Sequence, residues 1–533
     1  MANTNPVTTW PAWRRVIVVG AALGTLVGAQ QALAQPRAGG TLNWLVNPIP
    51  TGLVPLTTSA GGNTDIGPKV VEGLLTYDYD LKPKPLLATA WTVSPDGLQY
   101  RFELRRGVKW HDGRDFTSAD VAFSILTLKQ MHPRGRATFA NVTEVRTPDA
   151  HTAVLVLGKP APYLLTALAS AESPIVPKHL YEGTEIASNK HNTAPVGTGP
   201  FVFKEFVQGS HAIFERNPNY WDKPKPYLDR LVVRFIPDAV ARAAALESGA
   251  VDLGNAVIPL SDVERFRKLP NLSVDSDQWP YWGNHQQAYF NLDSPVLKNI
   301  EVRRAIAHAV DVNAYNNVVW YGYGKVSASP IGVAMSRYHD SSIKHQPYNL
   351  RQAEALLDAA GHRRDANGVR LKLRLLFNPF LERRTADFLR QSLARVGIDA
   401  EIESYDFATY VRKVYTERAF DITAESLLNT FDPTLGVQRV FWSKNFRIGL
   451  PFSNVPHYEN AEVDRLLEAA AIEPDESRRR QQFVAFQQQV AADIPSIEFG
   501  ANPNITVAAK KVRNYAPTAE GVRGSFAELY LAP

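Results

Sequence analysis

Residues 371–424 read LKLRLLFNPFLERRTADFLRQSLARVGIDAEIESYDFATYVRKVYTERAFDITA, and this stretch decides the fold class. Leu371, Leu373 and Leu375 alternate with Lys372 and Arg374, which is the period of a half-buried strand. A helical pattern then runs from Glu382 to Val396 and stops at Gly397. A second alternating strand follows at residues 398–403. Strand, helix and strand in this order predict a βαβ unit, and therefore an α/β protein.

The same pattern continues on both sides of this unit. Asn349 is placed to cap a helix that ends at Gly361. A further helix is expected near residues 407–417, and a third strand at residues 420–424. Because ligands of open α/β sheets bind beyond the carboxyl ends of the strands, residues 426–432 are a candidate binding segment.

The N-terminal half predicts a mixture of strands and helices. Thr117-Ser118-Ala119-Asp120 resembles a capping box that opens a helix through Leu128. Hydrophobic periodicity adds strands at residues 41–46, 100–104, 142–146 and 152–157, with a turn around Pro148-Asp149, and an early helix at residues 66–75.

Length and composition limit the classes of protein. The 533 residues suggest two to four domains, and 45% hydrophobic with 21% charged residues is typical of a globular protein. A net charge of +5, spread without a long basic run, gives little support to nucleic-acid binding. Cysteine is absent, which excludes disulfides, thiolate metal sites, cysteine nucleophiles and cysteine-linked lipid anchors.

The N-terminus indicates export. Arg14 and Arg15 precede an apolar run at residues 16–29, and Ala32-Leu33-Ala34 has the small residues of a cleavage site. The run is shorter than the roughly 20 residues that span a bilayer. We therefore expect a signal peptide at residues 1–34, a mature chain from Gln35 and a periplasmic location. Either general secretion or a twin-arginine route would suit this segment.

Familiar catalytic signatures are missing from the sequence: it has no Gly-x-Ser-x-Gly, no His-Glu-x-x-His, no calcium loop and no Walker A motif. Gly322-Tyr323-Gly324-Lys325 lacks the other residues of a phosphate loop. The twelve histidines are scattered, and neither His111 nor His308 lies in a metal-binding pattern. We expect no catalytic residue, no metal site and no cofactor.

Two loops combine aromatic, amide and small residues, which is the usual composition of a small-molecule cleft. One is residues 279–284, from which we select Tyr281, Trp282 and Asn284. The other lies within residues 426–433, from which we select Ser426, Asn429, Thr430, Phe431 and Asp432. The alternative interpretation is that these rings fill the core between domains.

Many short motifs, in order along nearly the whole chain, carry a family resemblance. The most specific are FELRRGVKWHDG at 102–113 and FTSADV at 116–121. Others include GGTL at 39–42, VEGLL at 71–75, GTGPF at 197–201, RNPNYW at 216–221, VRRAI at 302–306 and DIP at 493–495. The chain resembles the family 5 extracytoplasmic solute-binding proteins of ABC importers, the dipeptide, oligopeptide and nickel type.

This resemblance implies a periplasmic binding protein-like α/β fold of type II, cluster C. Two lobes, described as three domains, are joined by a two-strand hinge, for which residues 272–291 and 496–506 are the candidates. The implied domain I is residues 35–80, 199–280 and 500–533, domain II is 81–198, and domain III is 281–499. The 105–112 motif is interpreted as part of the extra domain, far from the ligand.

The resemblance also implies which residues contact the ligand. Family members use the segment before the first helix, here Ser59, Ala60, Gly61 and Asn63, and the loop ahead of Pro433. Peptide-binding relatives hold the ligand's α-ammonium with an aspartate four positions before that proline. The residue here is Asn429, so an ordinary peptide with a free N-terminus is not the expected ligand. Asp432 could supply the missing charge, but a helix-capping role is the favoured alternative.

The leading hypothesis is a periplasmic receptor that captures a small solute or peptide and delivers it to permease subunits in the inner membrane. We expect it to act as a monomer, with no nucleic-acid partner. An exported hydrolase of peptides or glycosides is the alternative. A surface adhesion or chaperone-like protein is a third possibility, and would have no closing cleft.

Overall fold

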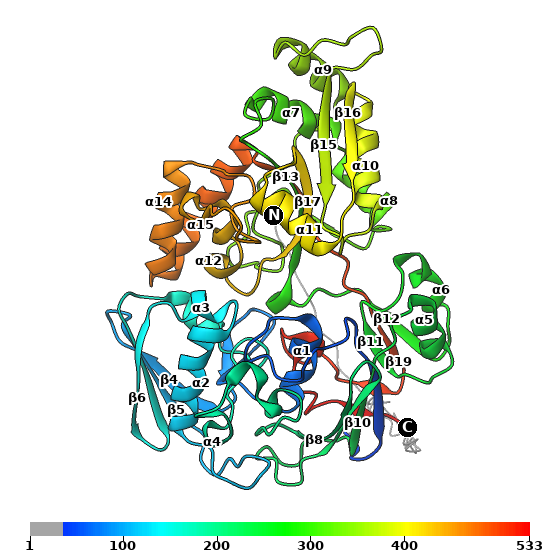
Figure 1. The fold of residues 1–533 in the computed structure, drawn as a ribbon. Helices are drawn as coiled ribbons and strands as arrows, with labels where there is room; N and C mark the ends of the chain where they lie inside the picture. Colours follow the sequence, from blue (N-terminus) through cyan, green and yellow to red (C-terminus); the bar gives the residue numbers. More distant parts are fainter. Residues whose placement is uncertain (1–35) are drawn as a thin grey trace, which may run out of the picture. The chain divides into compact units, whose positions relative to one another are not determined.

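A computed structural model describes residues 36–533 of the chain (Figure 1). The expected signal peptide, residues 1–34, and the expected mature N-terminus at Gln35 lie outside the described residues. Across residues 36–533, none of the helices has the length and apolar character needed to cross a bilayer.

One sheet has seven strands in the order β12-β19-β11-β1-β10-β9-β8. β1 pairs in parallel with β10 and β11, and the other pairings are antiparallel. Its strands come from three separate stretches of the chain: β1 (Thr41–Leu45), β8 (Phe201–Val207), β9 (His211–Arg216), β10 (Arg230–Arg234), β11 (Leu253–Asn255), β12 (Leu272–Asp275) and β19 (Thr506–Ala509). Leu42, Trp44, Phe214 and Val233 are buried in the core that this sheet supports.

A second sheet has six strands in the order β14-β18-β13-β17-β15-β16. The strands are β13 (Asn284–Phe290), β14 (Lys325–Val326), β15 (Leu371–Phe377), β16 (Ile398–Glu403), β17 (Ile422–Leu428) and β18 (Ser496–Ala501). β15 pairs in parallel with both β16 and β17, and α10 (Arg384–Ala394) connects β15 to β16. The predicted βαβ unit is therefore confirmed. Leu371, Leu373 and Leu375 are buried, as their alternation requires.

A third sheet is antiparallel, in the order β4-β5-β7-β6, with β4 (Ala88–Val93), β5 (Gln99–Leu104), β6 (Val142–Asp149) and β7 (Thr152–Leu157). The predicted capping box is confirmed: the Thr117 N–H donates to Asp120 Oδ2 at 2.9 Å and opens α2 (Ser118–Met131). β6 continues through Pro148 and Asp149, so the turn lies at residues 150–151. The expected turn position was wrong by two residues, because a bulge between Arg146 and Asp149 accommodates Pro148 within the strand.

Two segments pass from the seven-stranded to the six-stranded sheet, one between β12 and β13 and the other between β18 and β19. They run beside each other, since Asn502 N–H donates to the Asn284 carbonyl at 3.3 Å and Gln278 Nε2 to the Asn502 carbonyl at 3.0 Å. The two crossing segments expected from the sequence are thereby confirmed.

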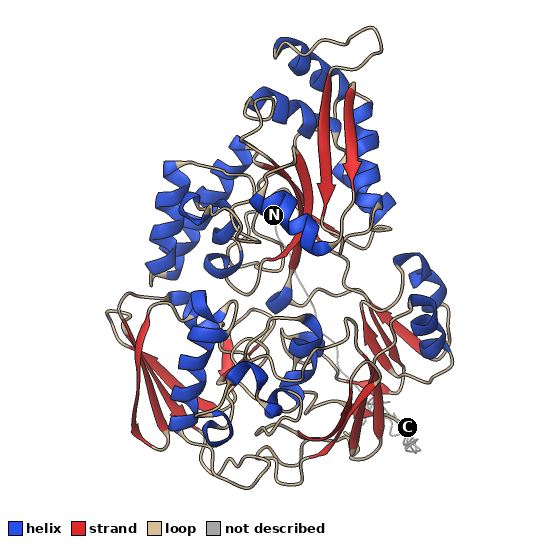
Figure 2. Ribbon diagram, in the orientation of Figure 1, coloured by secondary structure: helices blue, strands red, loops and turns tan. Residues whose placement is uncertain are grey.

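Helices and short strands complete the chain (Figure 2). The helices are α1 (Gly61–Ile66), α3 (Gly135–Thr138), α4 (Lys178–Tyr181), α5 (Ala239–Glu247), α6 (Val263–Arg267), α7 (Ile300–Ala309), α8 (Val312–Val319), α9 (Leu350–Ala359), α11 (Phe407–Val411), α12 (Pro433–Gly436), α13 (Gln438–Phe441), α14 (Ala461–Ile472) and α15 (Glu476–Asp493). The paired short strands are β2 (Leu75–Tyr77) with β3 (Pro83–Pro85), and β20 (Val512–Arg513) with β21 (Tyr530–Leu531).

The helix expected at residues 66–75 is wrong. α1 ends at Ile66, a 3-10 turn covers Gly67–Lys69, and β2 begins at Leu75. The apolar residues of this stretch are buried on all sides rather than along one helical face. Lys69 is buried too, and its ammonium donates to the carbonyls of Val522 and Gly524, which ties this segment to the C-terminal part of the chain.

Candidate functional site

The first candidate segment, residues 59–63, opens α1 instead of preceding it. Ala60 is the N-cap residue, and Gly61 and Asn63 lie inside the helix. Ala60 is exposed and Ser59 is half-buried, so this end of the segment is accessible. Asn63 is buried, and its Oδ1 has no hydrogen-bond partner. A buried acceptor without a partner is costly, so it is a natural point of contact for a ligand donor.

Tyr281 lies in packed core. The residue has no exposed surface, its hydroxyl donates to the Thr166 carbonyl at 2.8 Å, and its ring stacks on Phe431 with centroids 4.6 Å apart. Both rings pack into an apolar core that is formed mainly by residues 54–181. They therefore connect this core to the end of β17. Their assignment to ligand contact stays a prediction, while the geometry gives them a packing role.

Trp282, next to Tyr281, is different. Only 6% of it is exposed, yet its indole Nε1 has no hydrogen-bond partner. Two guanidinium groups lie over its ring, Arg523 at 4.5 Å and Arg134 at 5.6 Å from the ring centroid. Arg523 pairs with Asp65 of α1 at 2.7 Å, which links Trp282 to the helix that carries Asn63. A buried, unpartnered N–H among cations is a donor left for an acceptor.

Asn429 is held where β17 ends. Its main-chain N–H donates to the Gly283 carbonyl at 3.0 Å, and its side-chain Nδ2 donates to the Pro330 carbonyl at 3.1 Å. A carbonyl can only accept, so the amide nitrogen faces Pro330, and the groups left for a ligand, the second N–H of Nδ2 and Oδ1, are both uncharged. Thr430 follows in a left-handed conformation (φ 56°), and its hydroxyl donates to the Asn429 carbonyl at 2.7 Å.

Asp432 caps a helix, as the favoured interpretation expected. Its Oδ1 accepts from the Thr434 N–H at 2.9 Å at the start of α12. It also forms a two-pronged ion pair with Arg479 of α15, at 2.8 Å (Nη1–Oδ2) and 2.7 Å (Nη2–Oδ1). Both residues are buried. Its charge is therefore neutralised inside the protein by Arg479.

Asn284 and Ser426 lie beside a pocket at the crossing segments. This pocket has a volume of about 810 Å³ and is lined by Ile258 and Leu260 after β11, Trp320 and Phe380 near the six-stranded sheet, and Asn502 of the crossing segment. The Ser426 hydroxyl donates to Asn502 Oδ1 at 3.1 Å. Walls from both sheets and apolar rings next to a few polar groups are the composition of a small-molecule site.

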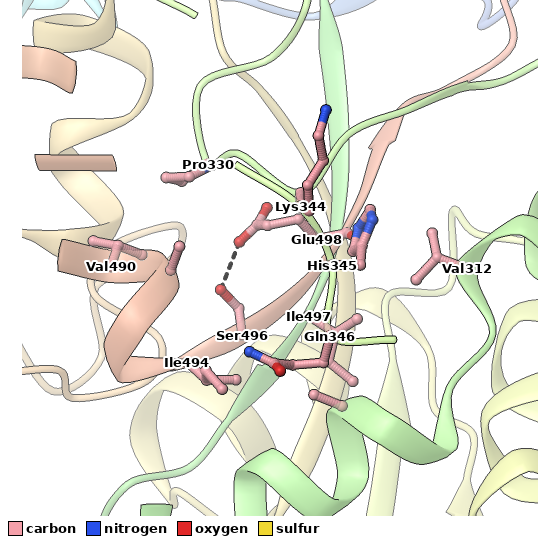
Figure 3. Close-up of a pocket in the computed structure, with 13 residues that line it drawn as sticks. Val312, Pro330, Lys344, His345, Gln346, Val490, Ile494, Ser496, Ile497 and Glu498 are labelled. Atoms are coloured by element: carbon pink, nitrogen blue, oxygen red, sulfur yellow. Dashed lines mark hydrogen bonds between the residues drawn. The ribbon is translucent and has the colours of Figure 1, made fainter. Parts of the chain in front are cut away.

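Another pocket, of about 510 Å³, lies within the half built on the six-stranded sheet (Figure 3). Pro330, His345, Val490, Ile494, Ser496 and Glu498 are among its lining residues, and the Ser496 hydroxyl donates to Glu498 at 2.6 Å. It contains none of the candidate residues. It touches the candidate site only through Pro330, the acceptor for Asn429.

Sequence reasoning missed the arginines that shape the site, Arg134, Arg439, Arg479 and Arg523. Arg439 bonds to carbonyls nearby in the chain, but Arg134, Arg479 and Arg523 each meet a group far along the chain, such as Asp432, which is 47 positions from Arg479. A spacing pattern in the sequence cannot signal such a contact.

The fold and the site together define the class of protein. Two sheets that are joined by two crossing segments, with a pocket at their junction, suit a protein that binds a solute. The family model of bacterial extracellular solute-binding proteins, family 5, matches residues 82–446. The chain belongs to this family, and it is a solute-binding receptor of an ABC importer.

Similar proteins match this chain over most of their length. The oligopeptide-binding protein AppA of Bacillus subtilis is 27% identical over 88% of this chain and 87% of its own. The periplasmic binding protein DppA of Helicobacter pylori, solved with the peptide STSA, has a TM-score of 0.78 and 26% identity, and the match covers 93% of this chain and 99% of DppA. AgaA of A. tumefaciens R10, solved with agropinic acid, has a TM-score of 0.75 and 26% identity over 93% and 99%.

Proposed function

We propose that this protein is a periplasmic receptor that captures a small peptide or peptide-like solute between its two lobes and delivers it to the permease subunits of an importer. The domain boundaries expected from the sequence belong to this proposal, as does action as a monomer without chemistry on the solute. A bound solute would favour the closed state of the lobes, because closure adds contacts between the protein and the solute.

The ligand in this proposal does not depend on a free α-ammonium group. The observation that carries it is the uncharged amide of Asn429, which Pro330 holds in place at the position where the family resemblance implies a carboxylate in peptide-binding relatives. The carboxylate of Asp432, three residues after Asn429, is paired with Arg479. Among similar proteins, DppA was solved with a peptide and AgaA with agropinic acid, so proteins of this fold bind both kinds of solute.

Native mass spectrometry of material from native export tests the receptor, because it detects any solute that co-purifies. Recovery of that solute unchanged, one per protein, supports a receptor. Its conversion to products by the protein would favour the hydrolase alternative.

Calorimetric titration tests the ligand class. Free and N-acetylated forms of one peptide are compared in the wild type, in Asn429→Asp, and in Asn367→Asp, a matched control in an exposed loop. An aspartate at 429 should tighten binding of the free-amine form by roughly 10- to 150-fold, because a charge-assisted hydrogen bond is gained. If the wild type already prefers the free-amine form, and Asn429→Asp adds nothing, this interpretation of Asn429 is wrong.

A further inference from the structure

The C-terminal segment of the chain forms one wall of a further cavity, with a volume of about 790 Å³. The other walls come from distant parts of the sequence, among them Thr76 of β2 and residues within 220–225, while the C-terminal wall lies within residues 515–528. None of the candidate solute contacts lines this cavity, and it shares no lining residue with the pocket at the crossing segments. It is therefore separate from the proposed solute site.

Glu520 is the buried carboxyl group in the wall of this cavity, and only 5% of it is exposed. Its Oε2 accepts hydrogen bonds from the hydroxyl groups of Thr76 and Thr518, both at 2.8 Å. Its Oε1 accepts no hydrogen bond from any residue in the range 36–533. One oxygen of the carboxyl group is thus satisfied by the protein, and the other is left for an occupant of the cavity.

No cation of the described chain pairs with Glu520. Lys69 attracts it, but the Lys69 ammonium already donates to three main-chain carbonyls at 2.5–2.8 Å, which uses all three of its N–H groups. Arg523, which also lines the cavity, directs its Nε to Asp65 at 2.7 Å. Burial raises the pKa of Glu520 to about 7, so the carboxyl group is poised to ionise beside an added cation.

The remaining charges of the cavity wall also favour a cation. Lys225 pairs with two carboxylates, that of Asp222 at 3.0 Å and that of Glu528 at 2.8 Å, and all three residues line the cavity. This group carries one positive and two negative charges. Because Arg523 is balanced by Asp65, the wall has an excess of negative charge.

We infer that this cavity binds the ammonium group of a small primary amine, with Glu520 Oε1 as the acceptor. An ammonium group supplies both the positive charge and the N–H donors that this oxygen lacks, and the resulting hydrogen bond is charge-assisted. The site goes beyond the proposed receptor function and does not depend on it.

Thermal unfolding of the full chain at pH 8 in n-butylammonium chloride, tetramethylammonium chloride and sodium chloride, at equal ionic strength, tests the site. The melting temperature should rise with n-butylammonium and saturate, as expected for a ligand of the folded state. It should not do so with tetramethylammonium, which has the same charge but no N–H, nor with sodium. Glu520→Gln keeps an acceptor for both threonines but loses the charge, and should weaken the apparent affinity for n-butylammonium roughly 10- to 150-fold.

The matched control is Glu401→Gln, which removes the same charge from an exposed residue of β16 and should behave as the wild type. Ala527→Leu adds bulk to the cavity wall without changing any charge, and should also weaken binding. An equal response to tetramethylammonium or sodium, or an n-butylammonium response that is absent from the wild type or unchanged in both Glu520→Gln and Ala527→Leu, overturns the inference. The peptide titrations that test Asn429 should give the same affinities in Glu520→Gln, so the amine site and the receptor function can fail separately.

Discussion

Replacing Arg479 by methionine is expected to cost about 3–5 kcal/mol of unfolding free energy, because it leaves the Asp432 carboxylate buried without a counter-charge. The magnitude follows from the geometry. Asp432 has no exposed surface and Arg479 only 3%. The guanidinium makes two hydrogen bonds to that carboxylate and also donates to Tyr338 Oη and Thr434 Oγ1. The substitution removes all of these donors at once.

Urea unfolding followed by circular dichroism measures this cost as a shift of the midpoint. Arg465→Met is the matched control, because Arg465 pairs with Glu462 at the surface and its loss should change stability little. In Asp432→Asn/Arg479→Met no buried charge remains, and an asparagine still caps α12, so the double variant should be more stable than Arg479→Met alone. The reasoning fails if Arg479→Met costs no more than Arg465→Met, or if the single-variant costs simply add.

Three further outcomes are expected. Gly436→Ala should abolish solute binding, because its new Cβ would lie 1.6 Å from the Asn429 carbonyl oxygen; calorimetry that shows unchanged affinity would contradict this. Burial raises the pKa of Glu520 to about 7, so the folded state keeps a proton that the unfolded state loses near pH 4.5, and stability should fall as the pH rises from about 4.5 to 7. Urea midpoints across this range should fall less steeply in Glu520→Gln, and an identical slope would refute the assignment. Tyr281→Phe should cost about 1 kcal/mol through its lost bond to Thr166 and leave solute affinity unchanged; a large loss of affinity with no loss of stability would instead make Tyr281 a ligand contact.

Much of the fold could be predicted from local patterns. The alternation at residues 371–375 and 398–402, with a helix between, is a short-range signal, and it led to the parallel pair β15–β16. Caps are equally local, since Asn349 accepts from the Gln352 N–H within one turn. The helix expected at residues 66–75 failed because those residues are enclosed by distant parts of the chain, a condition under which periodicity carries no information.

The candidate site was accessible to sequence reasoning only in part. The loop ahead of Pro433 and the aromatic stretch 279–284 do meet, as the Tyr281–Phe431 stack and the bond from Asn429 to Gly283 demonstrate. The sequence could not predict which groups of Asn429 and Asp432 already have partners, because those partners, Pro330 and Arg479, lie roughly 50 to 100 positions away along the chain.

By itself, the sequence determined the α/β class, the family, the helix caps and the absence of cysteine chemistry, because each of these is written in neighbouring residues or in the order of motifs. Only the tertiary structure decided which charges are paired. Asp432 is neutralised while Glu520 is not, and the reason is that a counter-charge acts over a few ångströms of space, whatever the distance along the chain.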